Sequence, residues 1–145
     1  MRDRDAALTG RSVRTQSWIG DAVFELQVRT RVALRGDFPV DRLDAIKAEV
    51  VRAESQAALL EAVLPALDDD EAAVVRRARN TTPPNSARGR RAMQSYRAAS
   101  ALEALIARWW LVEGGDARFE ALLGPQLDAA ITRAVELRAS KPKRG

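Results

Sequence analysis

Two acidic residues interrupt apolar stretches of the chain. Asp21 directly follows Gly20, and Glu103 lies within the apolar run 101–106. A glycine in the interior of a helix costs about 1 kcal/mol relative to alanine, so Gly20 indicates close approach by another group. Asp21 and Glu103 are far apart in the sequence, and their spacing does not predict that they meet. For each of them, the alternative is a solvent-exposed or ion-paired carboxylate at the edge of a helix.

The absence of two residue types narrows the chemistry that these acids can serve. The chain contains no histidine and no cysteine, which excludes an imidazole base, a thiol nucleophile, a disulfide framework and a zinc site with the usual ligands. Paired carboxylates that hold Mg²⁺ remain an economical way to cut a phosphodiester. A hard cation takes oxygen ligands, lowers the pKa of its bound water and stabilises charge on the phosphate.

The distribution of arginine indicates a polyanionic partner. The segment 76–97 contains no Asp and no Glu and carries a charge of +7, whereas the whole chain carries +4, so the rest carries −3. Clustered arginines release phosphate counterions and fork to phosphate oxygens, which favours nucleic acid. Tyr96 is the one aromatic residue of this segment, so recognition of a duplex backbone fits better than stacking of single-stranded bases. The alternatives are a solvated basic loop without a partner and an arginine content that reflects GC-rich coding. The candidate nucleic-acid-binding residues are Arg76, Arg77, Arg79, Arg88, Arg90, Arg91 and Arg97.

The elements that carry these residues are predicted to be helices, because the sequence is rich in Ala and Leu and has few alternating β-branched residues. Apolar residues spaced by three and four predict an amphipathic helix that runs from Ser17 to Arg35. Its apolar stripe consists of Trp18, Ile19, Ala22, Val23, Leu26, Thr30 and Ala33. The other predicted helices are 3–9, 41–64 with a break near Val50, 68–79 with a capping box of Asp68 and Glu71, 93–112, a short one capped by Asp116, and a last one that ends at Leu137. Residues 80–86 are predicted to form a loop, because prolines and Asn, Ser and Thr side chains compete with helix formation.

The length of 145 residues predicts one domain over residues 1–140, followed by a basic tail, 141–145. No apolar stretch is long enough to span a membrane, so no membrane partner is expected. The charged N-terminus does not resemble a signal peptide, and a chain without cysteine fits a reducing compartment. We therefore expect a cytoplasmic protein.

Three segments resemble one known family. The segment 18–26, WIGDAVFEL, resembles the signature helix of the ribonuclease III catalytic domain. The segment 76–80, RRARN, resembles the basic stretch of the Mini-III branch of that family, and 96–106, YRAASALEALI, resembles a later helix of the same branch. Their order and spacing hold over about residues 15–135. The chain is also too short for an additional double-stranded-RNA-binding domain, as is typical of Mini-III enzymes.

The resemblance implies a fold and an activity. The fold would be the all-α ribonuclease III endonuclease domain, acting as a homodimer in which each of two sites cuts one strand of a double-stranded RNA. Mg²⁺ would activate the attacking water, and the products would carry a 5′-phosphate and a 3′-hydroxyl. The bacterial Mini-III branch matures the ends of large-subunit (23S) ribosomal RNA precursors, so a ribosomal protein is a further candidate partner.

The resemblance also implies roles for individual residues. Asp21 matches the catalytic aspartate and Glu103 the metal-binding glutamate, and both would bind the metal. Glu54 falls where larger members carry a further acidic residue, so it would assist through water. Trp18 matches an aromatic residue at the dimer interface, with an ordinary core aromatic as the alternative.

Two positions depart from the larger members of the family. These members carry a Glu four residues before the catalytic Asp and an Asp three residues before the later Glu, where this chain has Ser17 and Ser100. With fewer carboxylates, water would fill most of the coordination shell of the metal. The alternatives to a Mg²⁺-dependent endoribonuclease are a non-catalytic RNA-binding or ribosome-associated relative and a generic helical dimerisation module. Retention of Asp21 and Glu103 argues against the former, and the acid-free segment 76–97 argues against the latter.

Overall fold

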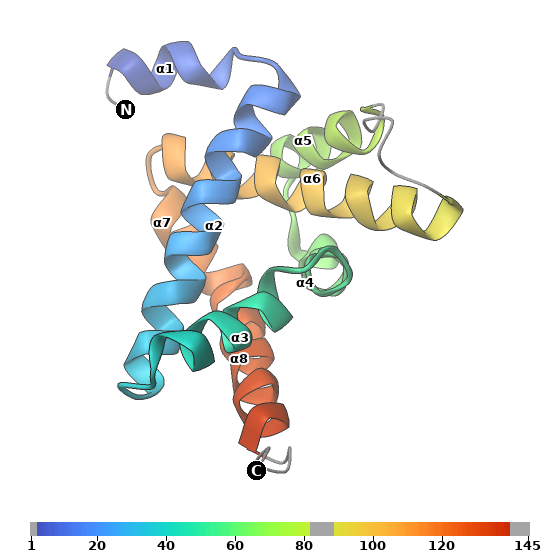
Figure 1. The fold of residues 1–145 in the computed structure, drawn as a ribbon. Coiled ribbons are helices and arrows are strands. Elements are labelled where there is room, and N and C mark those ends of the chain that lie inside the picture. Colours follow the sequence, from blue (N-terminus) through green and yellow to red (C-terminus); the bar gives the residue numbers. More distant parts are fainter. Residues whose placement is uncertain (1–2, 82–88, 140–145) are drawn as a thin grey trace.

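The computed structural model describes residues 3–81 and 89–139, and all regular elements of these residues are helical. In chain order they are α1 (Asp3–Thr9), α2 (Val13–Arg35), α3 (Val40–Val51), α4 (Ala53–Val63), the 3₁₀ turn η1 (Leu64–Ala66), α5 (Asp69–Arg79), α6 (Arg90–Leu111), α7 (Gly115–Leu122) and α8 (Gly124–Ala139). Figure 1 shows α2 crossing α6, with α8 extending away from this crossing beside α3. The prediction of an all-α fold is therefore confirmed.

The central element is α6, against which α2, α4 and α5 all pack. The apolar side chains of Leu102, Leu105, Ile106 and Trp109 are buried, as their spacing predicted. Because α6 is surrounded on several sides, any charged residue in its middle must lie at a contact with another helix. Glu103 occupies such a place, where α2 crosses α6.

The boundaries of α2 differ slightly from the prediction. The helix begins at Val13, one turn before Ser17, because the Ser12 hydroxyl caps it by accepting a hydrogen bond of 3.3 Å from the Thr15 amide. It ends at Arg35, as predicted.

The amphipathic character of α2 is confirmed, but most of the predicted apolar stripe does not face the core. The residues that pack inward are Phe24, Val28 and Val32, with Ser17 and Gly20 at the crossing. The predicted stripe lies a fraction of a turn away and is largely exposed. The exposed fraction is 77% for Trp18 and 55% for Leu26.

Two local predictions about α3, α4 and α5 are confirmed. The chain breaks at Arg52, which has an extended backbone conformation between α3 and α4, within two residues of the predicted position. At the start of α5, the Asp68 carboxylate accepts a hydrogen bond from the Glu71 amide, and the Glu71 carboxylate accepts one from the Asp68 amide. These two hydrogen bonds form the predicted capping box.

The prediction that Asp116 caps a helix is wrong. The first residue of α7 is Gly115, and its N-cap is Gly114, which adopts a φ of +77° and makes no side-chain capping hydrogen bond. Glycine adopts this left-handed conformation without steric cost, so the turn is made there and Asp116 falls inside the first turn of the helix. Most of the predicted loop 80–86 and the predicted tail 141–145 lie outside the described residues. Among the described residues, no helix combines the length and the apolar character that a membrane span requires.

Candidate active site

The site begins with a close contact between the backbones of α2 and α6. A Cβ atom added to Gly20 would lie 1.7 Å from the carbonyl oxygen of Glu103 and 2.5 Å from its carbonyl carbon. No side chain fits in that space, so the crossing exists in this form because residue 20 is glycine. The prediction that Gly20 marks a close approach is confirmed, and the group that approaches is the backbone of Glu103 itself.

This contact brings the two acidic residues singled out in the sequence to one place. Asp21 is the next residue after Gly20 and is exposed, whereas the side chain of Glu103 is half-buried. Burial, and to a smaller extent the nearby charge of Asp21, together raise the pKa of Glu103 to about 8. Among the described residues, no arginine or lysine forms an ion pair with either carboxylate. The two acids therefore lie together without a basic side chain of the described residues to balance their charge.

One helical turn away, the two helices are joined by a pair of serine hydroxyls. Ser17 Oγ donates a hydrogen bond of 2.9 Å to the carbonyl oxygen of Ser100, and the two hydroxyl oxygens lie 3.1 Å apart. Both residues are buried. In the sequence, Ser17 and Ser100 stood out only because larger family members carry acids at these positions. Their hydrogen bond was not predicted, because it joins residues 83 positions apart and no local pattern indicates it.

The donor set fits a hard divalent cation that keeps most of its water. Two carboxylates without a basic partner lie close enough to influence each other, and Mg²⁺ is commonly held by one or two carboxylates while it retains several waters. Within the part of the chain that the structure describes, no three residues of the types Asp, Glu, His and Cys are grouped closely enough to hold a metal ion. Any direct protein ligands would therefore be Asp21 and Glu103, with Glu54 outside this group.

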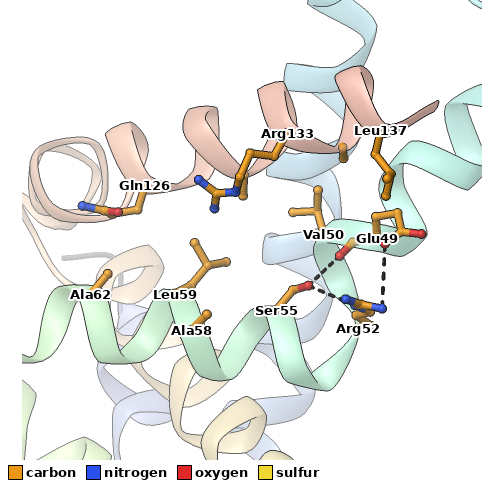
Figure 2. Close-up of a pocket in the computed structure, with 12 residues that line it drawn as sticks. Glu49, Val50, Arg52, Ser55, Ala58, Leu59, Ala62, Gln126, Arg133 and Leu137 are labelled. Atoms are coloured by element: carbon orange, nitrogen blue, oxygen red, sulfur yellow. Dashed lines mark hydrogen bonds and ion pairs between the residues drawn. The ribbon is translucent and has the colours of Figure 1, made fainter. Parts of the chain in front are cut away.

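Glu54 lies in the first turn of α4 and is exposed. The bend that precedes it is fixed by hydrogen bonds, which Figure 2 shows: Ser55 Oγ donates to the carbonyl oxygen of Glu49 over 2.6 Å, and Arg52 Nε donates to Ser55 Oγ over 3.3 Å. Next to this bend lies a cavity of about 250 Å³, between α4 and α8. None of the predicted site residues that the structure describes lines it, so it is distinct from the crossing of α2 and α6.

The structure places the candidate nucleic-acid-binding arginines at the end of α5 and in the N-terminal part of α6. Arg76, Arg77, Arg90 and Arg91 are exposed. Arg79 forms an ion pair of 3.1 Å with Glu61, so part of its charge is balanced within the chain. Arg97 precedes Glu103 by six residues, or roughly 9 Å along the axis of α6. Arg88 lies outside the described residues.

Trp18 is not a core residue, because 77% of its surface is exposed in the single chain. Large apolar side chains are also exposed farther along α2, at Leu26 and Leu34, and at Trp110 near the end of α6. Exposed apolar side chains are typical of surfaces that bind another protein when they form a contiguous patch, whereas single ones are common on any protein. Of these residues, Trp18 and Leu26 belong to the stripe that sequence periodicity predicted on α2, and periodicity could not tell whether that stripe faces the core of its own chain or a partner.

Comparisons with known proteins place the chain among known relatives. The family model described as "Ribonuclease III domain" matches residues 15–114, a span that contains the whole crossing. The Mini-ribonuclease 3 of Desulfitobacterium hafniense is 39% identical over 99 residues, which make up 67% of this chain and 60% of that protein. The Mini-ribonuclease 3 of Staphylococcus aureus is 34% identical over 111 residues, which make up 75% of this chain and 81% of the relative.

The fold is also found among solved structures. A crystal structure of a protein from Fusobacterium nucleatum superposes with a TM-score of 0.72 and 22% sequence identity, covering 84% of this chain and 92% of that one. At this identity, the likeness concerns the arrangement of the helices only.

Proposed function

This chain belongs to the ribonuclease III family, in its Mini-ribonuclease 3 branch, and from that premise we propose that it is an endoribonuclease that cuts double-stranded RNA. The observation that carries the proposal is the crossing at Gly20, beside which Asp21 and the half-buried Glu103 lie close together. A site that had lost cleavage would have no reason to keep both Asp21 and Glu103. This argument disfavours the alternative of a non-catalytic RNA-binding relative.

In the proposed mechanism, Asp21 and Glu103 together hold Mg²⁺. When bound, this cation supplies an activated water for in-line attack and balances the charge that develops on the phosphate. Asp21 presents its carboxylate from the exposed side of α2, where an RNA strand can reach it. Glu103 takes part in its ionised form, so it releases the proton that burial favours on its carboxyl group. Cleavage leaves a 5′-phosphate and a 3′-hydroxyl. Glu54 is proposed to assist through water from the start of α4.

The arginines of α5 and α6 are proposed to bind the RNA backbone. A duplex that lies along the N-terminal half of α6 would contact the exposed Arg90 and Arg91 and lead toward Glu103. Arg76 and Arg77 extend this basic surface at the end of α5, while Arg79, Arg88 and Arg97 complete the proposed set. Because the backbone is the same in every duplex, these contacts position the RNA and do not read its sequence.

The exposed apolar face of α2 is proposed to be the surface of a homodimer. Trp18 and Leu26 would be covered by a second copy of the chain, so that two sites act on the two strands of one duplex. The proposed substrate is the precursor of 23S ribosomal RNA, with cytoplasmic maturation of its ends. A ribosomal protein stays a candidate partner.

The test is cleavage of duplex RNA by the purified protein with Mg²⁺ and with EDTA, beside the variants Asp21→Asn and Glu103→Gln. We expect cleavage only by the wild type with Mg²⁺, and a loss of at least about 100-fold in each variant, since each removes one of two metal-binding carboxylates. An intact duplex after incubation of the wild type with Mg²⁺ would contradict the enzymatic proposal. Variants that cut as fast as the wild type would contradict the assignment of the two residues.

A further inference from the structure

The hydroxyls of Ser17 and Ser100 form a direct polar link between α2 and α6 beside the candidate active site. Ser17 lies four residues before Asp21, and Ser100 lies three residues before Glu103. Residues at these spacings share one face of a helix. The hydrogen bond of 2.9 Å from Ser17 Oγ to the Ser100 carbonyl oxygen thus lies one turn below the pair of carboxylates.

The contact at Gly20 and the link between the serines constrain different movements. Gly20 determines how closely the two helices approach, because any side chain there would meet the Glu103 backbone. Close approach alone does not set the register or the rotation of α2 on α6, which the packing of Phe24 and Val28 limits only through non-directional contacts. A hydrogen bond is directional, and this one is buried, so it also sets the register and the rotation of the two helices.

The hydrogen bond between the two serines is expected to contribute little to the stability of the fold. When both partners of a buried hydrogen bond are replaced by apolar groups of similar shape, the change in stability can be close to zero. Two alanines would fill nearly the same space in a crossing that is already tight. The value of the hydroxyl pair must then lie in its geometry, which fixes where Asp21 and Glu103 point.

We propose that Ser17 and Ser100 are positioning residues that hold α2 and α6 in the register at which Asp21 and Glu103 can share one divalent cation. This inference rests on the proposed function, because it assumes that the two carboxylates bind the metal. Neither serine is assigned as a metal ligand. Their link holds the crossing together without adding negative charge beside two carboxylates that already repel each other.

The experiment measures the affinity for Mg²⁺ by isothermal titration calorimetry without RNA, for the wild type and the double variant Ser17→Ala/Ser100→Ala. Groups that orient metal ligands typically contribute 10–100-fold to metal affinity, so we expect Mg²⁺ to bind about 10-fold more weakly to the double variant. The rate of RNA cleavage at saturating RNA should fall with it, while the affinity for RNA without metal should stay the same. The single variant Ser100→Thr keeps a hydroxyl and should retain at least half of the wild-type affinity.

Thr132→Val is the matched control. It removes a hydroxyl that accepts a hydrogen bond of 2.8 Å from Arg35, at the opposite end of α2, and should leave the affinity for Mg²⁺ unchanged. Thermal midpoints of all variants show whether each protein is folded, and Ser17→Ala alone provides the same comparison if the double variant unfolds.

The outcomes separate this inference from the proposed function. If the wild type neither binds Mg²⁺ nor cuts duplex RNA, the proposed function is wrong, and the inference falls with it. If the wild type does both and the folded alanine variants match it, only the positioning role is wrong. An equal loss of Mg²⁺ affinity in Thr132→Val would also overturn that role, since the effect would then come from general loosening of α2.

Discussion

At the scale of single residues, Gly20 is the position on which the site depends most. Replacement by alanine would place a Cβ atom 1.7 Å from the Glu103 carbonyl oxygen, so the two helices would have to move apart. Forced overpacking of this kind typically costs 1–3 kcal/mol, and here the neighbour is backbone that cannot rotate away. We expect Gly20→Ala to lower the free energy of unfolding by about 3 kcal/mol and to abolish RNA cleavage.

The matched control for this prediction is Gly10→Ala. A Cβ atom at Gly10 would meet only the Ala7 carbonyl oxygen, at an ordinary contact distance of 3.8 Å. Urea denaturation of the two variants should therefore show a large loss for Gly20→Ala and almost none for Gly10→Ala. Equal stability of both variants would mean that the crossing is looser than the structure describes.

The sequence was sufficient to identify the individual residues of the candidate site, but not to predict which of them contact one another. Gly20 was interpretable alone, because a helical glycine next to an acid needs a steric reason. The proximity of Asp21 and Glu103 could not be predicted from the sequence, since it depends on how two helices cross. The link between Ser17 and Ser100 was out of reach for the same reason, because each serine is an ordinary helical residue until its partner is known.

At the scale of elements, Glu71 joins three helices. As the third residue of α5 it completes the capping box. It also accepts a hydrogen bond of 2.6 Å from Trp109 Nε1 in α6 and pairs with Arg118 in α7. Burial raises the pKa of Glu71, but the hydrogen bonds from Arg118, the Asp68 amide and Trp109 outweigh burial and lower the pKa to about 2. Its carboxylate is thus held in the charged form by partners on every side.

The depressed pKa predicts a specific dependence of stability on pH. An acid whose pKa is lower in the folded state stabilises the fold above its unfolded pKa of about 4.5, and this contribution is lost as the pH falls toward 2. Hydrogen bonds to charged groups contribute about 1.5–3 kcal/mol, so we expect Glu71→Gln to lower the free energy of unfolding by about 2 kcal/mol at pH 7.

Urea denaturation at pH 7 and at pH 3 checks this prediction. The difference between wild type and Glu71→Gln should be smaller at pH 3, where part of the contribution of the carboxylate is already gone. Glu113→Gln, which changes an exposed acid between α6 and α7, serves as the control and should have little effect at either pH. A difference that grows as the pH falls would contradict the assigned role of the Glu71 carboxylate.

The sequence predicted one part of this junction well. A capping box is local, so Asp68 and Glu71 were identified from a spacing of three residues. Trp109 and Arg118 lie 38 and 47 residues farther along the chain, and only the packing of α5, α6 and α7 brings them to Glu71. The buried face of α2 was predicted wrongly for a related reason. Periodicity identifies an apolar stripe, but it does not tell whether the core of the same chain or a partner covers that stripe.

At the scale of the whole molecule, the exposed stripe of α2 has a consequence for assembly. Trp18 makes little contact within its own chain, so Trp18→Glu should leave the thermal midpoint of the single chain nearly unchanged. In the proposed homodimer, the same change would bury an unpaired charge, which is strongly unfavourable. Sedimentation velocity should therefore show a dimer for the wild type and a monomer for Trp18→Glu.

The control is Leu137→Glu on α8, where the side chain is 44% exposed, and this variant should stay a dimer. A monomeric wild type would contradict the dimer.

The second property of the whole molecule is its division into a basic surface and an acidic remainder. A chain with a net charge of only +4 concentrates +7 in residues 76–97, so its attraction to RNA should come from that segment alone. Each phosphate contact contributes about 0.9 to the slope of log Kobs against log salt concentration on a duplex. The triple variant Arg88→Ala/Arg90→Ala/Arg91→Ala should reduce the slope by about 2–3, if each arginine contacts one phosphate.

The control for this experiment removes one arginine elsewhere. Arg133 is exposed on α8 and lines the cavity of Figure 2, away from the crossing of α2 and α6. Arg133→Ala changes the net charge of the protein by one but removes no charge from the segment 76–97. If binding depends on where the charge lies, Arg133→Ala keeps the wild-type slope. If it depends on net charge alone, Arg133→Ala flattens the slope by about a third as much as the triple variant, and the assignment of RNA binding to α5 and α6 is wrong.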